Sequence, residues 1–144
     1  MVSESKAVRE ILFRGKENPS GKWVEGFYNH IPCGRFLCDE HLIQTIDTDG
    51  RIGQLFTVYD STVGQFTGLT DKNGKKIFED DICRVSRPCV IAYGHIEFAN
   101  GCFWFVDHGP GGMLRLCDVR MNGFTIEVIG NIHDNPELLE GRDG

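Results

Sequence analysis

The sequence predicts a mainly β protein built from short-stranded hairpins. Two observations indicate this class. The 18 glycines are spread among short runs of β-branched and aromatic residues, a pattern typical of tight turns between strands. Among the Asp-Gly and Asn-Gly dipeptides, those at 49–50, 73–74 and 100–101 lie near apolar residues, and these dipeptides favour hairpin turns. We therefore expect short strands rather than long helices.

The composition narrows the class of protein further. With 144 residues, 40% hydrophobic and 25% charged, the chain is long enough for one core or two small subdomains and is typical of folded proteins. The formal net charge of -6 gives no sequence-wide attraction for nucleic acid or anionic lipid. There is no signal-peptide pattern and no long apolar span, so we expect a cytoplasmic protein with no membrane partner. In that reducing compartment the six cysteines should be free, mostly buried thiols.

A hairpin is predicted near the N-terminus. Strands at 11–15 and 23–28 flank a turn at 18–21 that reads Asn-Pro-Ser-Gly. On an ideal strand Trp23 and Phe27 lie on one face and Tyr28 lies on the other, so both faces carry bulky groups. We expect this strand to be covered on both sides, or in part by another subunit. Trp23, Phe27 and Tyr28 are therefore candidate interface residues.

The middle of the chain is dominated by turns. After an irregular segment at 31–42, strands are predicted at 42–46 and 52–59 on either side of the Asp-Gly turn. Residues 63–82 then combine many turn-forming residues with apolar residues that can pack on either side of the turns. Their structural turn residues are Gly64, Gly68, Asp71, Asn73 and Gly74. The turn at 73–74 should let Leu69 face Ile77.

The C-terminal half is predicted to be a series of strands. Their ranges are 82–85, 90–93, 95–98, 102–106, 114–117 and 124–130. Residues 135–140 then indicate a short helical turn with Pro136 at its start, where proline is favoured.

Residues 62–82 form a recognisable sequence motif. They read Thr-Val-Gly-Gln-Phe-Thr-Gly-Leu-Thr-Asp-Lys-Asn-Gly-Lys-Lys-Ile-Phe-Glu-Asp-Asp-Ile, which resembles the signature of the YopX family, small proteins carried by bacteriophages and prophages. Residues 23–28, the aromatic strand after Gly101 and residues 127–139 agree as well, so the likeness covers nearly the whole chain. Asp80 replaces a glycine of the family wording, and Asp is one of the few residues tolerated in a left-handed conformation.

The resemblance implies a fold, an origin and a division of the chain. It implies a β-rich protein with an SH3-like C-terminal barrel, carried by a phage or prophage and located in the host bacterial cytoplasm. It transfers no catalytic residue. We expect an N-terminal β subdomain over 1–62, a connecting turn-rich signature over 63–82 and an SH3-like β-barrel subdomain over 83–144, packed as one compact unit.

A metal site is one hypothesis for function. Cys33, Cys38 and His41 lie in one irregular segment, and Cys83 with Cys89 could supply more sulfur. Four residues separate the first cysteine pair and five separate the second, at or beyond the usual zinc spacing of about two to four. The spacing favours ordinary thiols and a surface histidine, so no cofactor is predicted.

Nucleic-acid binding is a second hypothesis, because small β proteins can stack bases on aromatic side chains. The stacking candidates are Phe98, Phe103, Trp104 and Phe105, with Arg84, Arg87, Arg115 and Arg120 as the nearby cations. Aromatic residues that alternate along a strand are usually core residues, however, and the net charge is acidic.

No other catalytic constellation was found in the sequence. The carboxylates at 79–81 are adjacent on an extended segment and point in different directions, which is unsuitable for a Mg²⁺ or Ca²⁺ site. The glycine-rich loop at 108–112 resembles an oxyanion loop, but the sequence has no Gly-x-Ser-x-Gly motif to supply the nucleophile. The leading hypothesis is a noncatalytic phage or prophage accessory protein that acts through contacts with phage or host proteins, or as a homo-oligomer. A nucleic-acid-binding protein is the alternative, and a zinc-binding protein or enzyme is third.

Overall fold

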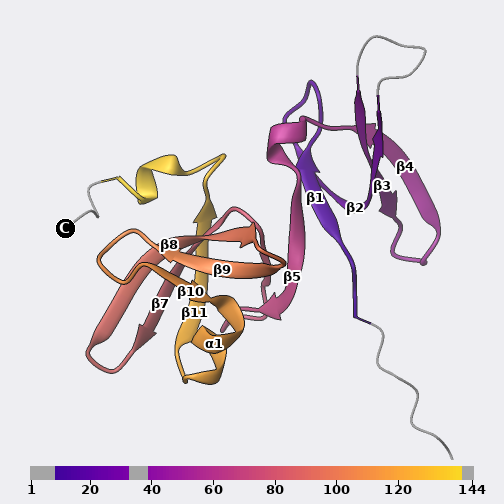
Figure 1. Ribbon diagram of the computed structural model, residues 1–144. Helices are drawn as coiled ribbons and strands as arrows, with labels where there is room; N and C mark the ends of the chain where they lie inside the picture. Colours follow the sequence, from indigo (N-terminus) through magenta and orange to yellow (C-terminus); the bar gives the residue numbers. More distant parts are fainter. Residues whose placement is uncertain (1–8, 33–38, 141–144) are drawn as a thin grey trace, which may run out of the picture.

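The protein consists of two antiparallel sheets that lie side by side in the computed structural model, which describes residues 9–32 and 39–140 (Figure 1). The first sheet has the order β4-β3-β2-β1-β5-β6. Its strands are β1 (Phe13–Lys16), β2 (Trp23–Ile31), β3 (Glu40–Ile46), β4 (Ile52–Thr57), β5 (Gly64–Thr70) and β6 (Lys76–Phe78). The mainly β class is thereby confirmed.

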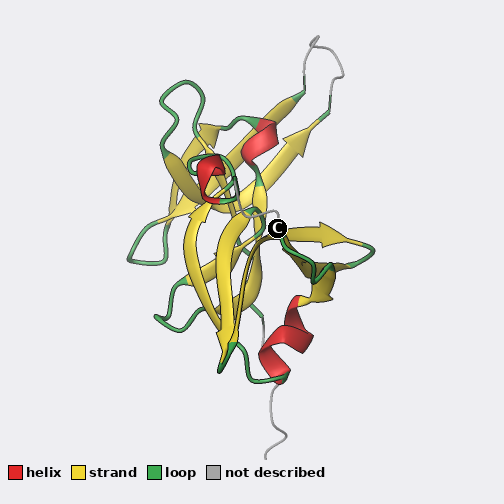
Figure 2. Cartoon of the chain, turned by 90° about the vertical axis from the view of Figure 1, so that its left-hand side faces the viewer, coloured by secondary structure: helices red, strands yellow, loops and turns green. Residues whose placement is uncertain are grey.

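The second sheet has the order β10-β9-β8-β7-β11. Its strands are β7 (Asp81–Arg87), β8 (Val90–Ala99), β9 (Cys102–Asp107), β10 (Met113–Arg115) and β11 (Thr125–Asn131). The helical segments are η1 (Asp60–Thr62), α1 (Leu116–Met121) and η2 (Pro136–Leu138), short pieces in a structure made mostly of strands (Figure 2). The predicted turn that starts at Pro136 is confirmed as η2.

The SH3-like barrel is not confirmed, because neither sheet closes on itself among the described residues. The second sheet is open, with β10 and β11 at its two edges. In the first sheet an isolated bridge joins Glu17 to Val58, and the backbone N–H of Asn18 donates to the carbonyl of Thr57 at 2.9 Å. These contacts draw the end of β4 toward the end of β1.

The predicted hairpin turns are confirmed. Gly50, Gly74 and Gly101 have φ of 80°, and Asn100 has φ of 52°. Positive φ at both central residues, as at 100–101, is the geometry that matches the twist of two hairpin strands. Asp80 has φ of 72°, so the residue that replaces the family's glycine does hold a left-handed conformation.

Three expectations were wrong. Residues 90–93 and 95–98 do not form separate strands, because β8 continues through Gly94. Residues 114–117 do not form one strand, because β10 ends at Arg115 and α1 begins at Leu116. Leu116 and Val119, three residues apart, are each 2% exposed, so one face of this short helix enters the core. The four described cysteines are free as expected but are not mostly buried, because only Cys83 is buried, while Cys89 and Cys117 are exposed.

The main core lies in the second sheet. Its buried residues are Ile77, Cys83, Val85, Ile96, Phe105, Leu116, Val119 and Ile126. Leu69 of β5 packs against this cluster, which also contains Ile77 of β6, so the hairpin of the first sheet contributes to the core of the second. A smaller cluster of Leu12, Phe66 and Phe78 lies beside β1.

Residues 63–82 take part in both sheets. They comprise β5, β6 and the first residues of β7. The division into 1–62, 63–82 and 83–144 stays a prediction. Within residues 9–32 and 39–140, no helix has the length and apolar character needed to cross a membrane.

Candidate functional site

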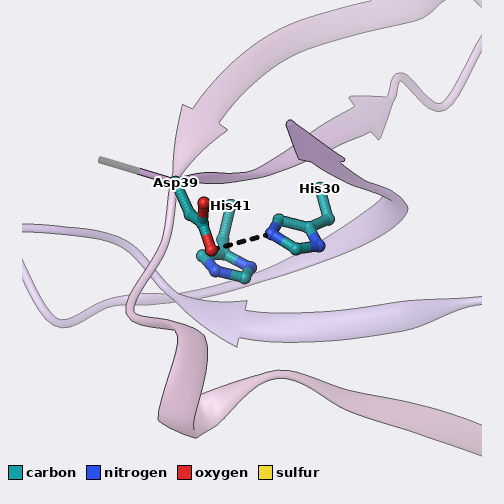
Figure 3. Close-up of side chains that lie close together, drawn as sticks. All are labelled: His30, Asp39 and His41. Carbon is teal, nitrogen blue, oxygen red and sulfur yellow. Dashed lines mark ion pairs between the residues drawn. The ribbon is translucent and has the colours of Figure 1, made fainter. Parts of the chain in front are cut away.

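Two histidines meet at one end of the first sheet. His30 near the end of β2 pairs directly with His41 near the start of β3 in the antiparallel register. Directly opposed residues project from the same face of a sheet, with their Cβ atoms close together. The two imidazole rings are accordingly stacked, with centroids 4.3 Å apart and an interplanar angle of 8°. Figure 3 shows the two rings next to each other.

Asp39 adds a carboxylate to the histidine pair. It immediately precedes β3, and its Oδ2 lies 3.3 Å from Nε2 of His30 (Figure 3). One potential ligand atom from each of His30, Asp39 and His41 lies within 4.8 Å of the other two. We call these three residues the His-Asp-His cluster. Its side chains are 43%, 48% and 17% exposed in the order His30, Asp39, His41, so an ion or small molecule can reach it from solvent.

Tyr28 and Asp60 fix the orientation of His41. The Tyr28 hydroxyl lies 2.5 Å from Nδ1 of His41, and the Nε2 atom of His41 lies 3.9 Å from Oδ2 of Asp60. Burial raises the pKa of Tyr28, and the negative charges of Asp60 and Asp39 raise it further. The phenol therefore stays protonated, and its hydrogen bond with Nδ1 leaves Nε2 of His41 facing the carboxylates.

An open cavity adjoins the cluster. It has a volume of about 430 Å³, and its lining includes the acidic residues Asp39, Glu40 and Asp60 together with His41. Such a cavity favours cations over anions, because three carboxylates outnumber the one imidazole.

Of the predicted metal-binding residues, only some are found near the histidine pair. His41 belongs to the cluster, whereas Cys33 and Cys38 lie outside the described residues. Cys83 is buried in the core of the second sheet, and Cys89 is exposed at the turn between β7 and β8. His30 and Asp39 were not predicted from the sequence. The signal that could have found them is a hairpin register that pairs 30 with 41.

The three interface candidates of β2 have different surroundings. Trp23 donates its indole N–H to Oδ2 of Asp134 at 2.7 Å, so it contacts the C-terminal part of the same chain. Tyr28 lies against Phe13, with ring centroids 5.4 Å apart. Only Phe27 remains widely exposed, at 49%.

Phe27 belongs to an exposed apolar face on β2, β3 and β4. The register pairs Phe27 with Gln44, Gln44 with Leu55 and Ile46 with Ile52, which puts these residues on one side of the sheet. We define the apolar face as Phe27, Ile31, Ile46, Ile52 and Leu55, which are 49%, 51%, 45%, 70% and 56% exposed. This face is opposite to the one that carries the His-Asp-His cluster, because neighbouring residues on a strand alternate in direction.

The nucleic-acid candidates are divided between the two faces of the second sheet. Trp104 pairs with Arg115 and with Glu97, so these three lie on one face, and Arg84 shares that face. Phe98 lies on the other face, where its ring contacts Phe103 at 5.1 Å.

The candidate arginines already have partners. Arg115 pairs with Asp118 at 2.8 Å, and Arg84 donates to Oγ of Ser86 at 3.5 Å. Arg87 lies over the Phe124 ring at 4.6 Å, and Arg120 donates to the carbonyl of Thr70 at 2.6 Å. Phe105 is buried in the core. The arrangement therefore lacks a continuous row of exposed cations beside stacked aromatic rings.

The turn residues of 63–82 have structural partners. Asp71 is 6% exposed, and its Oδ1 accepts from the backbone N–H groups of Asn73 and Lys75 while its Oδ2 accepts from Val128, each at 2.9 Å. Burial alone would raise the pKa of Asp71, but these N–H donors outweigh it and lower the pKa. Asp71 thus holds the β5–β6 hairpin to β11. A Cβ atom at Gly64 would lie 3.0 Å from the carbonyl oxygen of Glu79, and Gly68 has φ of 87°.

Comparison with known proteins shows the family of the chain. The family model described as YopX protein matches residues 12–140, which is most of the chain. No curated protein matches the sequence.

Proposed function

Because the chain belongs to the YopX family, we propose that it is a noncatalytic phage or prophage accessory protein that acts through protein contacts. The observation that carries this proposal is the apolar face on β2, β3 and β4. Five large apolar side chains, each 45% to 70% exposed, share one side of three neighbouring strands. Scattered apolar residues are ordinary on a protein surface, whereas a contiguous apolar patch is typical of a contact site.

A second copy of the chain fits this face better than a charged partner. Among the residues between the apolar side chains, Asn29, Gln44 and Thr57 are neutral, whereas Glu40 lies opposite Ile31 at one end of the face. Two copies that each carry a net charge of -6 repel one another over most of their surfaces. The neutral part of this face is where such copies can meet with the least repulsion. β4 is also an edge strand of its sheet.

The test is the oligomeric state of matched variants. Light scattering coupled to size exclusion should show a dimer or larger species for the wild type at micromolar concentration, and a monomer for Leu55→Lys. Ile91→Lys is the matched control, because Ile91 is also 56% exposed but lies on β8 of the second sheet. It should leave the assembly unchanged. Thermal unfolding must stay similar in both variants, since both sites are exposed. A monomeric wild type would contradict self-association through this face.

Nucleic-acid binding is supported less well. Trp104, Arg84 and Arg115 do share a face, but Glu97 and Glu127 lie beside them in the same register. Carboxylates among the arginines reduce the attraction for phosphate groups, on which most nucleic-acid affinity depends.

A further inference from the structure

We propose that His30, Asp39 and His41 form a binding site for a divalent transition-metal ion, with zinc as the best match. Two imidazoles and one carboxylate are a donor set that zinc takes in proteins. Calcium and magnesium prefer sites made of oxygen atoms alone, and so fit two nitrogen donors poorly. The proposal does not depend on self-association, because the cluster lies on the opposite face of β2 and β3 from the apolar face.

The spacing of the ligand atoms fits a tetrahedral ion. With metal–ligand bonds of about 2.0 Å, two ligands of a tetrahedral ion lie about 3.3 Å apart. The Nε2 atom of His30 and the Oδ2 atom of Asp39 are 3.3 Å apart. The remaining separations within the cluster reach at most 4.8 Å. The partly exposed side chains of His30 and Asp39 can close that difference by rotation, without movement of the strands.

The backbone holds the site in place. His30 and His41 are fixed opposite each other by the pairing of β2 with β3, which continues from Phe27–Gln44 to Ile31–Glu40. A site built on two paired strands is positioned more accurately than one built on loops alone. Asp39 immediately precedes the first residue of β3, so its backbone is held close to this pairing.

The contacts that His41 makes with Tyr28 and Asp60 also fit a metal site. A ligating histidine generally binds the ion with one ring nitrogen and donates the other N–H to an oxygen. The Tyr28 hydroxyl is placed to accept from Nδ1 of His41, at 2.5 Å, which leaves Nε2 for the ion. Asp60, whose Oδ2 is 3.9 Å from this Nε2, lies where it can complete the coordination or bind a metal-bound water.

The decisive experiment is a zinc titration of the full untagged chain against a chromophoric chelator, with cobalt absorption as a second probe of coordination. We expect one zinc per chain. His30→Ala and His41→Ala should each weaken zinc binding at least about 10-fold. His30→Ala is the more informative variant, because a side chain that is 43% exposed can be removed without opening a cavity. Added zinc should also raise the thermal midpoint of the wild type but not of His30→Ala.

Three controls make the result specific. His108→Ala should bind zinc like the wild type, because His95 and His108 form a separate histidine pair in the second sheet, with ring nitrogens 2.8 Å apart. Calcium and magnesium should not compete at equal concentration. The double variant Cys33→Ser, Cys38→Ser tests the cysteines. No saturable zinc binding, unchanged binding in His30→Ala, or a loss of binding confined to His108→Ala or to the cysteine variant would each overturn the proposal.

Discussion

Gly74 is a residue whose requirement for glycine comes from the backbone alone. It lies in the turn between β5 and β6 with φ of 80°, and a Cβ atom built there would have no heavy atom within 4 Å. Gly74→Val should therefore destabilise the protein by about 1–2 kcal/mol through its left-handed conformation, not through a clash. Urea unfolding measures the loss. Gly74→Asn is the matched control and should cost less, because Asn tolerates this conformation. Equal stability of Gly74→Val and wild type would contradict the explanation.

Residues differ in how far their structural role can be predicted from the sequence. The positive φ of Gly74 and Gly101 was predictable from local turn chemistry, whereas that of Asp80 was expected only because the family resemblance implies a glycine at this position. His41 was singled out, but its partner His30 was not. That pairing depends on which residue of β2 lies opposite His41, and an irregular segment of uncertain length separated the two strands in the sequence. Long-range register is set by packing and cannot be derived from neighbouring residues.

At the scale of elements, α1 shows how a short segment can be misassigned. Residues 114–117 alternate apolar and other side chains, which is typical of a strand, and only six residues form the helix. A helix this short gives too few turns to establish a 3.6-residue period. Its helical form is decided by the burial of Leu116 and Val119 in the core of the second sheet. The helical conformation of α1 is therefore determined by tertiary packing.

A buried ion pair connects β1 to β7 and thus the first sheet to the second. Arg14 contacts Asp81 at 2.7 Å, with side chains 12% and 1% exposed. The other oxygen of Asp81 accepts from the backbone N–H of Phe78 at 2.7 Å. Burial raises the pKa of Asp81, although Arg14 and the Phe78 N–H act to lower it. Arg14 is thus the main group that keeps this buried carboxylate charged.

Arg14→Met should consequently destabilise the protein by about 3–5 kcal/mol at pH 7, because it leaves a buried carboxylate without its counter-ion. Without Arg14 the pKa of Asp81 rises further. When the pKa of a carboxyl group is higher in the folded state than in the unfolded state, the folded protein becomes more stable as the pH falls. Part of the stability that Arg14→Met loses should therefore be recovered between pH 7 and pH 5. Urea unfolding at both pH values measures this.

The matched control for Arg14→Met is Lys76→Met. Lys76 pairs with Glu10 at 2.9 Å, but the two side chains are 41% and 54% exposed. An exposed pair contributes at most about 1 kcal/mol, and its loss should show little dependence on pH in this range. If Arg14→Met lost the same stability at pH 7 and pH 5, the account of Asp81 as an uncompensated buried charge would be wrong.

The whole molecule is held together by polar contacts between its two sheets as well as by the shared core. Lys16 of β1 forms an ion pair with Asp134, and Trp23 of β2 donates to the same carboxylate at 2.7 Å. The Trp23 ring also contacts His133, with centroids 6.0 Å apart. Asp134 follows β11, so one carboxylate links the first sheet to the end of the second.

This link makes docking of the sheets sensitive to acid. The hydrogen bonds from Lys16 and from Trp23 lower the pKa of Asp134 to about 2. Because this pKa is lowered, the Asp134 carboxylate stabilises the folded protein above the ordinary aspartate pKa near 4. This stabilisation is lost as the pH falls from 4 toward 2. Asp134→Asn should therefore be less stable than the wild type at pH 7, and the difference should shrink between pH 4 and pH 2. Denaturant unfolding at each pH checks this.

Trp23 fluorescence can show whether the sheets separate before the chain unfolds. A Trp104→Phe background leaves Trp23 as the reporter, since the chain has two tryptophans. If the Asp134 contacts couple the sheets into one cooperative unit, the Trp23 signal and the far-ultraviolet circular dichroism of the wild type should change together. In Asp134→Asn the Trp23 signal should change first. Asp118→Asn is the control, because Asp118 pairs with Arg115 beside α1, away from the contact between the sheets. Coincident transitions in Asp134→Asn would mean that the shared core around Leu69 and Ile77 is sufficient to couple the two sheets.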